Sequence, residues 1–241
     1  MVGQRGDMTS DDALRALLRD LLAPGSSANS ALDRLLADYA TYHLVFVVLA
    51  GALVLGLLGA GGSLLRRSRR MRTGPGAAHP SARRTSFGLG LGCVGTAALF
   101  AVLVAANAGN ALDPRQGFGG AVAEIRPSVV GTTRAAEQDA FAGWLRSGGE
   151  RLPARVRGVV ERRVAWQAPK AVGSALLFGV SVWLTVRLWR RLIEPDRALV
   201  GRRARLSAAV ASSGASLVLM AMTIGNTQGA VAPLAATLLY G

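Results

Sequence analysis

The chain has 241 residues, of which 51% are hydrophobic and only 17% are charged. That charge content is low for a soluble globular domain, and the missing charge is missing in long blocks, which excludes an ordinary soluble protein. The only cysteine is Cys93, so an intramolecular disulfide framework is excluded as well. The net charge of +14 does not by itself show what the basic residues contact. Their distribution along the chain indicates their partners.

The first forty residues predict two amphipathic helices and no cleavable signal peptide. Residues 1–8 are polar and lack an apolar segment. Leucines at helical spacing form one apolar stripe over residues 10–23, which Pro24 and Gly25 end. A second amphipathic helix is predicted at 30–41. Because nothing breaks its pattern, we expect it to continue into the membrane.

Four apolar stretches are long enough to predict membrane-spanning helices. A span needs roughly 20 consecutive apolar residues. The third stretch is the shortest, but Lys170 and Arg187 near its ends have long stems that can reach the membrane interfaces. The predicted spans are 42–65, 86–108, 170–189 and 206–226.

The densest basic runs lie in the two short loops that join these spans. Residues 66–84 contain seven arginines and no acid, and residues 187–205 contain seven arginines and two acids. Arginine-rich short loops stay in the cytoplasm, so both termini and the central loop are expected outside a plasma (inner) membrane. Anionic lipid head groups are the expected contact, and no nucleic acid is expected as a partner. The arginines chosen as this topology signal are Arg66, Arg67, Arg69, Arg70, Arg83, Arg84, Arg190, Arg191, Arg202 and Arg203.

The region between the second and third spans predicts a linker and two more amphipathic helices. Glycines and prolines over 116–133 predict an extracytoplasmic loop. Helical patterns resume at 134–147 and at 150–166. After the last span, the apolar tail 229–241 is too short to cross a membrane, so it is expected either to lie in the interface or to pack among the outer helices.

The two halves of the chain show the same order of features. A shift of 119 residues aligns identical residues, among them Arg84 with Arg203, Asn107 with Asn226 and Pro114 with Pro233. We therefore predict two repeats, 1–115 and 134–241, joined by the linker. Two hairpins of the same orientation make the repeats parallel. The predicted fold class is all-α: a polytopic membrane protein with four transmembrane helices from two parallel two-span repeats, and an extracytoplasmic cap of amphipathic helices.

Residues 90–95 match the dinucleotide-binding pattern GxGxxG. That pattern binds pyrophosphate only where a strand turns into a helix, whereas here it lies inside a charge-free span. Small residues at helical spacing instead allow two helices to approach closely. The glycines expected to pack in this way are Gly88, Gly92, Gly95 and Gly214. Those of the first span are interpreted in the same way: Gly51, Gly56, Gly59, Gly61 and Gly62.

No grouping of residues predicts catalysis, a cofactor or a metal ion. His43 and His79 are isolated, with no cysteine or carboxylate at ligand spacing. No GxSxG motif is present, and the carboxylates cluster at expected helix starts and in charge pairs. We therefore do not expect an enzyme.

Polar side chains gather near the expected outer ends of the second and fourth spans. Asn107 and Asn226 each lie 23 residues beyond the second arginine of their arginine pair. They could form a polar ring at an outer vestibule. Alternatively, each ends a helix near a glycine where water begins. The candidate outer site comprises Asn107, Asn110, Thr223, Asn226 and Gln228.

Two functions are consistent with this pattern. The first is a non-enzymatic integral membrane protein of the cell envelope, an accessory or structural subunit whose extracytoplasmic helices dock another membrane or envelope protein, or another copy. The alternative is a small channel or transporter with a polar vestibule around Asn107 and Asn226. No predicted span carries Asp, Glu, Lys or Arg at mid-depth, which weakens an ion-coupled transport hypothesis.

Overall fold

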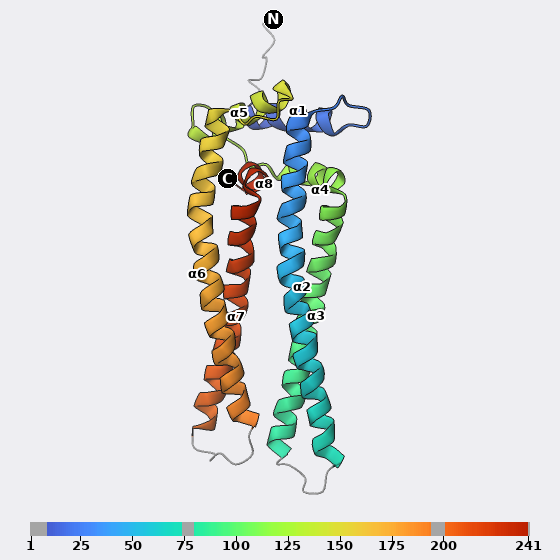
Figure 1. The fold of residues 1–241 in the computed structure, drawn as a ribbon, viewed down its shortest axis with the longest axis vertical. Coiled ribbons are helices and arrows are strands. Elements are labelled where there is room, and N and C mark those ends of the chain that lie inside the picture. Colours follow the sequence, from blue (N-terminus) through green and yellow to red (C-terminus); the bar gives the residue numbers. More distant parts are fainter. Residues whose placement is uncertain (1–8, 74–79, 194–200, 241) are drawn as a thin grey trace, which may run out of the picture. The chain divides into compact units, whose positions relative to one another are not determined.

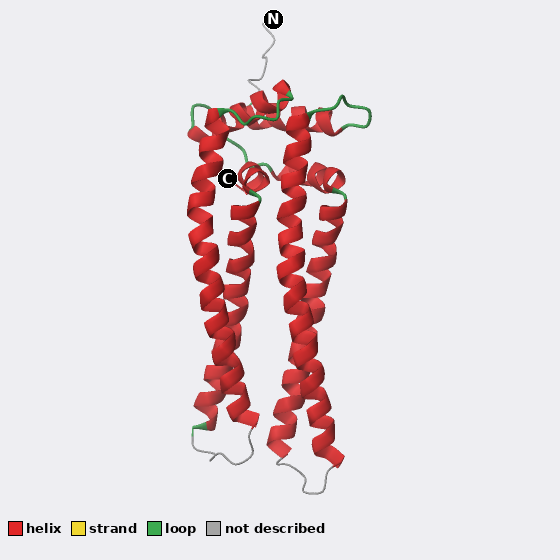
Figure 2. Cartoon of the chain, in the orientation of Figure 1, coloured by secondary structure: helices red, strands yellow, loops and turns green. Residues whose placement is uncertain are grey.

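The computed structural model describes residues 9–73, 80–193 and 201–240. This described part of the chain is helical and contains no strand (Figure 2), so the all-α prediction is confirmed. The helices, labelled in Figure 1, are α1 (Ser10–Leu22), α2 (Ser30–Thr73), α3 (Pro80–Leu112), α4 (Pro114–Ala121), the 3-10 helix η1 (Val122–Glu124), α5 (Thr133–Ser147), α6 (Ala154–Ile193), α7 (Arg202–Val231) and α8 (Pro233–Tyr240).

Four helices, α2, α3, α6 and α7, are long and apolar enough to cross a membrane. Large apolar side chains on them are exposed, for example Leu55 at 72% and Val102 at 68%. Lipid is the environment that so much exposed apolar surface requires, so the chain is a multi-pass membrane protein. Helix α2 has 44 residues. It is therefore about 66 Å long, roughly twice the thickness of a hydrocarbon core, and part of it lies outside the membrane.

The chain forms two compact units. The head unit comprises Met1–Val45, Asn107–Ala168 and Thr227–Gly241, and the span unit comprises Phe46–Ala106 and Pro169–Asn226. These units cut across the two predicted repeats, because each long helix has residues in both units.

Apolar stripes of the helices form the core of the head unit. Leu14 and Leu18 of α1 and Leu35 of α2 are fully buried, and they belong to one cluster with Phe141 and Trp144 of α5. Burying a large apolar side chain contributes roughly 1.5–3 kcal/mol. The apolar faces predicted for the two N-terminal helices therefore account for where those helices pack.

Helix α4 occupies part of the predicted loop 116–133. Asp113 is its N-cap and accepts a hydrogen bond from the N–H of Gln116 at 3.0 Å. Pro114 follows at the first helical position, where a missing N–H costs nothing. These start signals outweigh the glycines of the segment. The loop prediction is corrected accordingly, since only residues 125–132 lie outside helices there.

The segments predicted at 150–166 and 170–189 form one continuous helix, α6, with Pro169 inside it. Proline removes one intrahelical hydrogen bond, but the turns on both sides continue the helix. The preceding helix α5 ends at Gly148, whose φ of 63° is the left-handed conformation that glycine adopts without strain.

The predicted tail 229–241 contains the last turn of α7 and helix α8. Leu234, Leu238 and Leu239 of α8 are buried in the head core. Of the two placements that the sequence leaves open, the structure has the tail packed among the helices of the head unit. Residue 241 lies outside the described residues.

Within the span unit, α2 and α3 form a hairpin (Figure 1). Their backbones approach closely at two glycines. A Cβ on Gly90 would lie 2.7 Å from Cγ of Leu65, and one on Gly61 would lie 3.1 Å from the carbonyl oxygen of Gly90. By contrast, there is open space beside the glycines of the second and fourth spans that were predicted to pack, Gly88, Gly92, Gly95 and Gly214. In this hairpin the close approach lies at Gly61, one of the glycines expected to pack, and at Gly90, which was not among them.

Helices α6 and α7 form a second hairpin, in which hydroxyl groups meet. The hydroxyl oxygens of Thr185 and Ser212 are 2.7 Å apart, and those of Ser181 and Ser216 are 2.9 Å apart. Because lipid offers no competing hydrogen bonds, such pairs favour helix association in a membrane.

Candidate functional site

Asn107, the first member of the predicted polar site, lies in the head unit and is half-buried. Its Oδ1 is 2.7 Å from Nδ1 of His43. Because an amide oxygen only accepts, Nδ1 of His43 is the donor in this bond. The His43 ring also packs edge-on against Tyr39, with centroids 4.4 Å apart. Asn107 therefore holds a buried aromatic group of α2 in place.

Gln228 and Asn110 also make contacts within the head unit. The Nε2 of Gln228, a buried residue, donates to the backbone carbonyl of Tyr42 at 2.9 Å. The amide of Asn110 lies against α4, since a Cβ on Gly117 would be 2.7 Å from Oδ1 of Asn110. Both side chains thus connect one helix with another inside the head.

Thr223 and Asn226 lie in the span unit and bond to their own helix. The hydroxyl of Thr223 donates to the carbonyl of Leu219 at 2.8 Å, and Nδ2 of Asn226 donates to the carbonyl of Met222 at 2.7 Å. Bonds of this kind satisfy a polar group locally. The residues aligned by the sequence shift, Asn107 and Asn226, therefore have different partners.

The arginines predicted to set the topology lie toward the ends of the four long helices, next to residues 74–79 and 194–200, which are outside the described part of the chain. Those whose side chains are described are exposed. The guanidinium of Arg66 bonds back to the carbonyl of Gly62 at 3.2 Å. The side chain of Arg202 is outside the description, although α7 begins at this residue.

A buried carboxylate fastens the loop between η1 and α5. Asp11, only 3% exposed, accepts hydrogen bonds from the N–H and the hydroxyl of Ser128 at 3.2 and 3.4 Å. It also pairs with Arg15 at 3.2 Å, and Arg15 donates to the carbonyl of Ile125 at the start of the loop. Burial raises the pKa of Asp11, but the Ser128 amide and Arg15 help to lower it more, so the net pKa lies below its usual value.

The same loop is also bonded to α5 and has a hydrogen bond of its own. Nε2 of Gln138 donates to the backbone carbonyl of Arg126 at 3.0 Å. The hydroxyl of Thr132 donates to the backbone carbonyl of Val129 at 2.7 Å. Between these attachments, Val129 and Val130 are 73% and 77% exposed. The loop therefore presents two adjacent apolar side chains on a backbone that is hydrogen-bonded on both sides.

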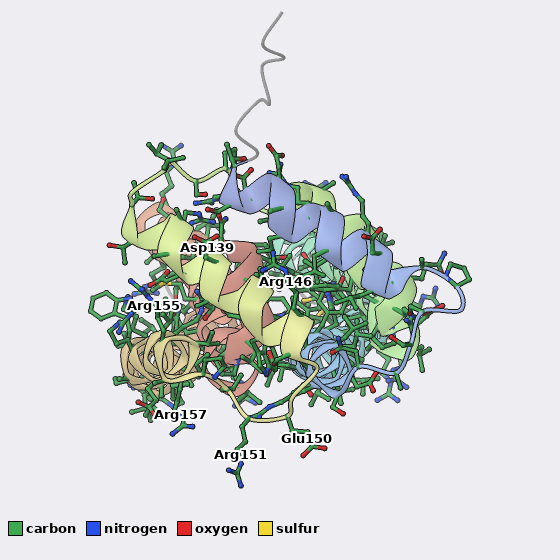
Figure 3. The ribbon with its side chains drawn as sticks, turned by 90° about the horizontal axis from the view of Figure 1, so that it is seen from above. Asp139, Arg146, Glu150, Arg151, Arg155 and Arg157 are labelled. Atoms are coloured by element: carbon green, nitrogen blue, oxygen red, sulfur yellow. The ribbon has the colours of Figure 1, made fainter. Side chains whose placement is uncertain are left out.

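Exposed charged side chains surround the connection between α5 and α6. Figure 3 labels them as Asp139, Arg146, Glu150, Arg151, Arg155 and Arg157. Glu150 and Arg151 point away from the helices at the edge of this connection (Figure 3). Both signs of charge are present. Another protein surface can match such a pattern of charges.

Asp38 of α2 caps a helix that is distant in the sequence. Its Oδ2 accepts a hydrogen bond from the N–H of Ala235, near the start of α8, at 2.8 Å. Burial raises the pKa of Asp38 to about 6, although the backbone amides of Ala235 and Leu234 and the charge of Arg34 act in the lowering direction. Asp38 precedes the charge-free stretch of α2 and belongs to the head unit.

Within the described residues, no group of three or more His, Cys, Asp or Glu side chains could hold a metal ion. Comparison with known protein families, with curated proteins and with solved structures finds no match. A functional hypothesis for this chain therefore rests on its own fold and surfaces.

Proposed function

We propose that this chain is a non-enzymatic, multi-pass protein of the plasma membrane whose head unit docks another envelope protein or a second copy. The observation that carries the proposal is the fastened loop with the exposed Val129 and Val130. Removing a charge from water costs several kcal/mol unless it is well paired. The buried and paired Asp11 thus supports one defined loop conformation, and apolar groups that are already ordered lose little freedom on binding.

The proposed orientation places the head outside the cytoplasm. Its support is the arginine-rich ends of α2, α3, α6 and α7, which by charge belong on the cytoplasmic side, against anionic lipid head groups. Single cysteines test it, at Ser27 in the head and at Gly76 between α2 and α3, in a Cys93→Ala background. A membrane-impermeant thiol reagent on intact cells should label Ser27→Cys only. Labelling of Gly76→Cys alone would reverse the orientation.

A duplicated ancestry for the two halves is part of the proposal. Its support is the coincidence of helix ends: a shift of 119 residues superposes the last residue of α3 on that of α7. The same shift superposes both ends of α4 on both ends of α8. A proline begins each of these two short helices, which are the same length.

Site-specific photo-crosslinking tests the docking function. A benzophenone amino acid at Val130 should give, in living cells, a light-dependent adduct of defined mass. The same group at Ala37, an exposed head residue on α2, is the matched control and should give none. An adduct of twice the chain mass identifies a second copy, and any other discrete mass identifies a partner protein.

Two further outcomes bear on the docking proposal. The double variant Val129→Ser/Val130→Ser should lose the partner while keeping the fold, because both side chains are already in water. No adduct at Val130, or equal adducts at Val130 and Ala37, would contradict the proposal.

The channel or transporter alternative has less support. His43 and the Tyr42 carbonyl already engage Asn107 and Gln228, and Thr223 and Asn226 bond to carbonyls of α7. Measuring solute flux through the purified protein in liposomes distinguishes the two functions. A solute flux that changes in the Asn107→Leu/Asn226→Leu variant would favour a channel over a docking protein.

A further inference from the structure

Arg163 of α6 is a half-buried cation in the head unit with no acidic partner among the described residues. Its Nε is buried and makes no hydrogen bond within the described part of the chain. By contrast, the neighbouring Arg162 is exposed and pairs with Glu137 at 3.5 Å. Burying a cation without a counter-charge costs free energy, yet an arginine keeps its charge. An anion from outside the chain would therefore stabilise Arg163.

Polar side chains from three helices lie around this cation. Tyr42 of α2 interacts electrostatically with Arg163. The rings of Tyr42 and Tyr240 of α8 have centroids 5.8 Å apart. On α6, Gln167 lies one turn after Arg163, and its Oε1 is also buried without a hydrogen-bond partner in the described chain. The four side chains Arg163, Gln167, Tyr42 and Tyr240 are called the Arg163 site below.

Contacts with α7 connect the two sides of the Arg163 site. A Cβ on Gly229 would lie 3.1 Å from Cγ of Gln167, so this side chain packs directly on the backbone of α7. The preceding residue, Gln228, donates to the backbone carbonyl of Tyr42 at 2.9 Å. The same turn of α7 therefore contacts Gln167 on α6 and is bonded to α2.

The Arg163 site lies at the depth of lipid head groups. Tyr42 is the first residue of the predicted span 42–65, and tyrosine is enriched at membrane interfaces. Arg163 lies seven residues before Lys170, where the charge-free part of α6 begins, which is roughly 10 Å along the helix. Between them, Trp166 is 66% exposed, as expected of an interfacial aromatic residue. Head groups occupy this layer outside the hydrocarbon core.

We propose that the Arg163 site binds the phosphate group of a phospholipid head group from the leaflet on the head side. The proposal depends neither on the docking function nor on the orientation of the chain, because phospholipid head groups are present in both leaflets.

The donors and acceptors of the site fit such a head group. A guanidinium binds phosphate oxygens through parallel N–H donors, and the hydroxyl groups of Tyr42 and Tyr240 can donate to a further oxygen. Oε1 of Gln167 can accept from a hydroxyl group of the lipid, so a glycerol head group suits the site. Glu124 of η1 acts on Tyr240, so we expect the phosphate on the Arg163 side of the tyrosine pair, away from that carboxylate.

Photo-crosslinking to a lipid head group tests the proposal. The full-length protein is placed in nanodiscs that contain phosphatidylglycerol with a diazirine on its glycerol head group. After illumination, peptide mapping should find adducts on peptides that contain Tyr42, Tyr240 or residues 163–167. Adducts at the arginine-rich ends of the four long helices provide a reference yield within the same sample.

One variant and a matched control separate the site from general attraction to anionic lipid. Arg163→Gln should lower the adduct yield at the Arg163 site about tenfold relative to the reference, the effect of one lost hydrogen bond to a charged group. Arg162→Gln makes the same change of charge at the next residue, whose side chain is exposed, and should leave the yield unchanged. Arg163→Lys keeps the charge without the planar fork and should lower the yield less than Arg163→Gln.

Competitors identify the part of the lipid that is recognised. Excess unlabelled phosphatidylglycerol should reduce the adducts at the site, whereas diacylglycerol, which lacks the phosphate, should not. Glycerol 3-phosphate should compete weakly, because it lacks the acyl chains that concentrate a lipid at this depth. Equal competition by glycerol 3-phosphate would assign the site to a soluble phosphate ester and overturn the lipid proposal. No adduct at the site in the unmodified protein, or equal losses in Arg163→Gln and Arg162→Gln, would also overturn it.

Discussion

The two hairpins of the span unit are held together by different chemistry. In α2–α3, the backbones meet at Gly61 and Gly90, where a Cβ would be too close to its neighbours. In α6–α7, four hydroxyl-bearing residues meet instead, with Thr185 opposite Ser212 as the shortest contact at 2.7 Å. Lipid gives no hydrophobic drive for helix pairing, so close packing or hydrogen bonds must provide the stability. Close packing at glycines marks the first hairpin, which also has a hydrogen bond from the hydroxyl of Ser68 to the carbonyl of Arg83 at 3.4 Å. Hydrogen bonds between hydroxyl groups mark the second.

The positions of α3 that face α2 nevertheless correspond to the positions of α7 that face α6. Under the 119-residue shift, Gly90, Cys93 and Ala97 correspond to Ala209, Ser212 and Ser216. All of these except Cys93 are buried, and Cys93 is half-buried beside Gly61. If the halves are duplicates, as we propose, the interface positions were kept while the residues that fill them diverged. The following experiments test that comparison.

The largest effect is expected at the glycine contact. Gly90→Val places methyl groups against Leu65 and the Gly61 carbonyl, so the α2–α3 hairpin must separate. Overpacking of this kind costs about 1–3 kcal/mol. Reversible unfolding in bicelles measures it. The control is Gly92→Val, which has open space beside it and should change stability by less than about 0.5 kcal/mol. Equal losses would mean that the glycine contact does not hold the hairpin.

A smaller effect is expected when the hydroxyls are removed. Ser212→Ala/Ser216→Ala deletes the hydroxyl contacts with Thr185 and Ser181. Interhelical hydrogen bonds in membranes average about 0.6 kcal/mol each, so the double variant should lose about 1 kcal/mol in the same assay. Ser207→Ala, at an exposed position of α7, is the control. A double variant as stable as the control would leave the second hairpin dependent on apolar packing alone.

Trp189 provides one more bond within the second hairpin. Its Nε1 donates to the hydroxyl of Ser213 at 3.0 Å. Trp189→Phe keeps an aromatic ring but removes the donor, so we expect a loss of about 0.6 kcal/mol. In a Ser213→Ala background the same change should cost nothing further. A full loss in that background would assign the effect to the size of the ring.

The smallest effect is expected from exchanging the chemistry of the hairpins. Cys93→Ser/Ala97→Ser gives the first hairpin the residues of the second at matching positions. A helical serine can bond to the carbonyl four residues earlier, so stability should change by less than about 0.5 kcal/mol. A loss above about 1 kcal/mol would argue that the two sets of positions are not equivalent.

The features that could be predicted from the sequence are those encoded by neighbouring residues. Charge-free stretches located the four long helices, and the absence of a breaker before residue 42 indicated that α2 is continuous. Helix α4 also had a local signal, Asp113 followed by Pro114, but three nearby glycines favoured a loop. The stronger signal was the cap, because it satisfies a specific amide.

The features that could not be predicted depend on contacts between distant segments. Glycine spacing shows that a helix can pack closely, but not which of its faces meets another helix, so Gly61 was one of five candidates in the first span and Gly90 was not among the expected glycines. Asp11 and Asp38 resemble ordinary solvated acids in the sequence. Their roles depend on Ser128 and Ala235, which are 117 and 197 residues away. The orientation, the repeats and the candidate polar site remain predictions.

Cys93 provides a natural site for labelling the contact between the two helices of the first hairpin. Its Cβ lies 3.2 Å from where a Cβ on Gly61 would be, so the only thiol of the chain sits at the contact between α2 and α3. A bulky maleimide attached there would act as a wedge between the two helices. The labelling rate of the unmodified protein therefore reports how accessible the thiol at this contact is, and no engineered probe is needed to follow it.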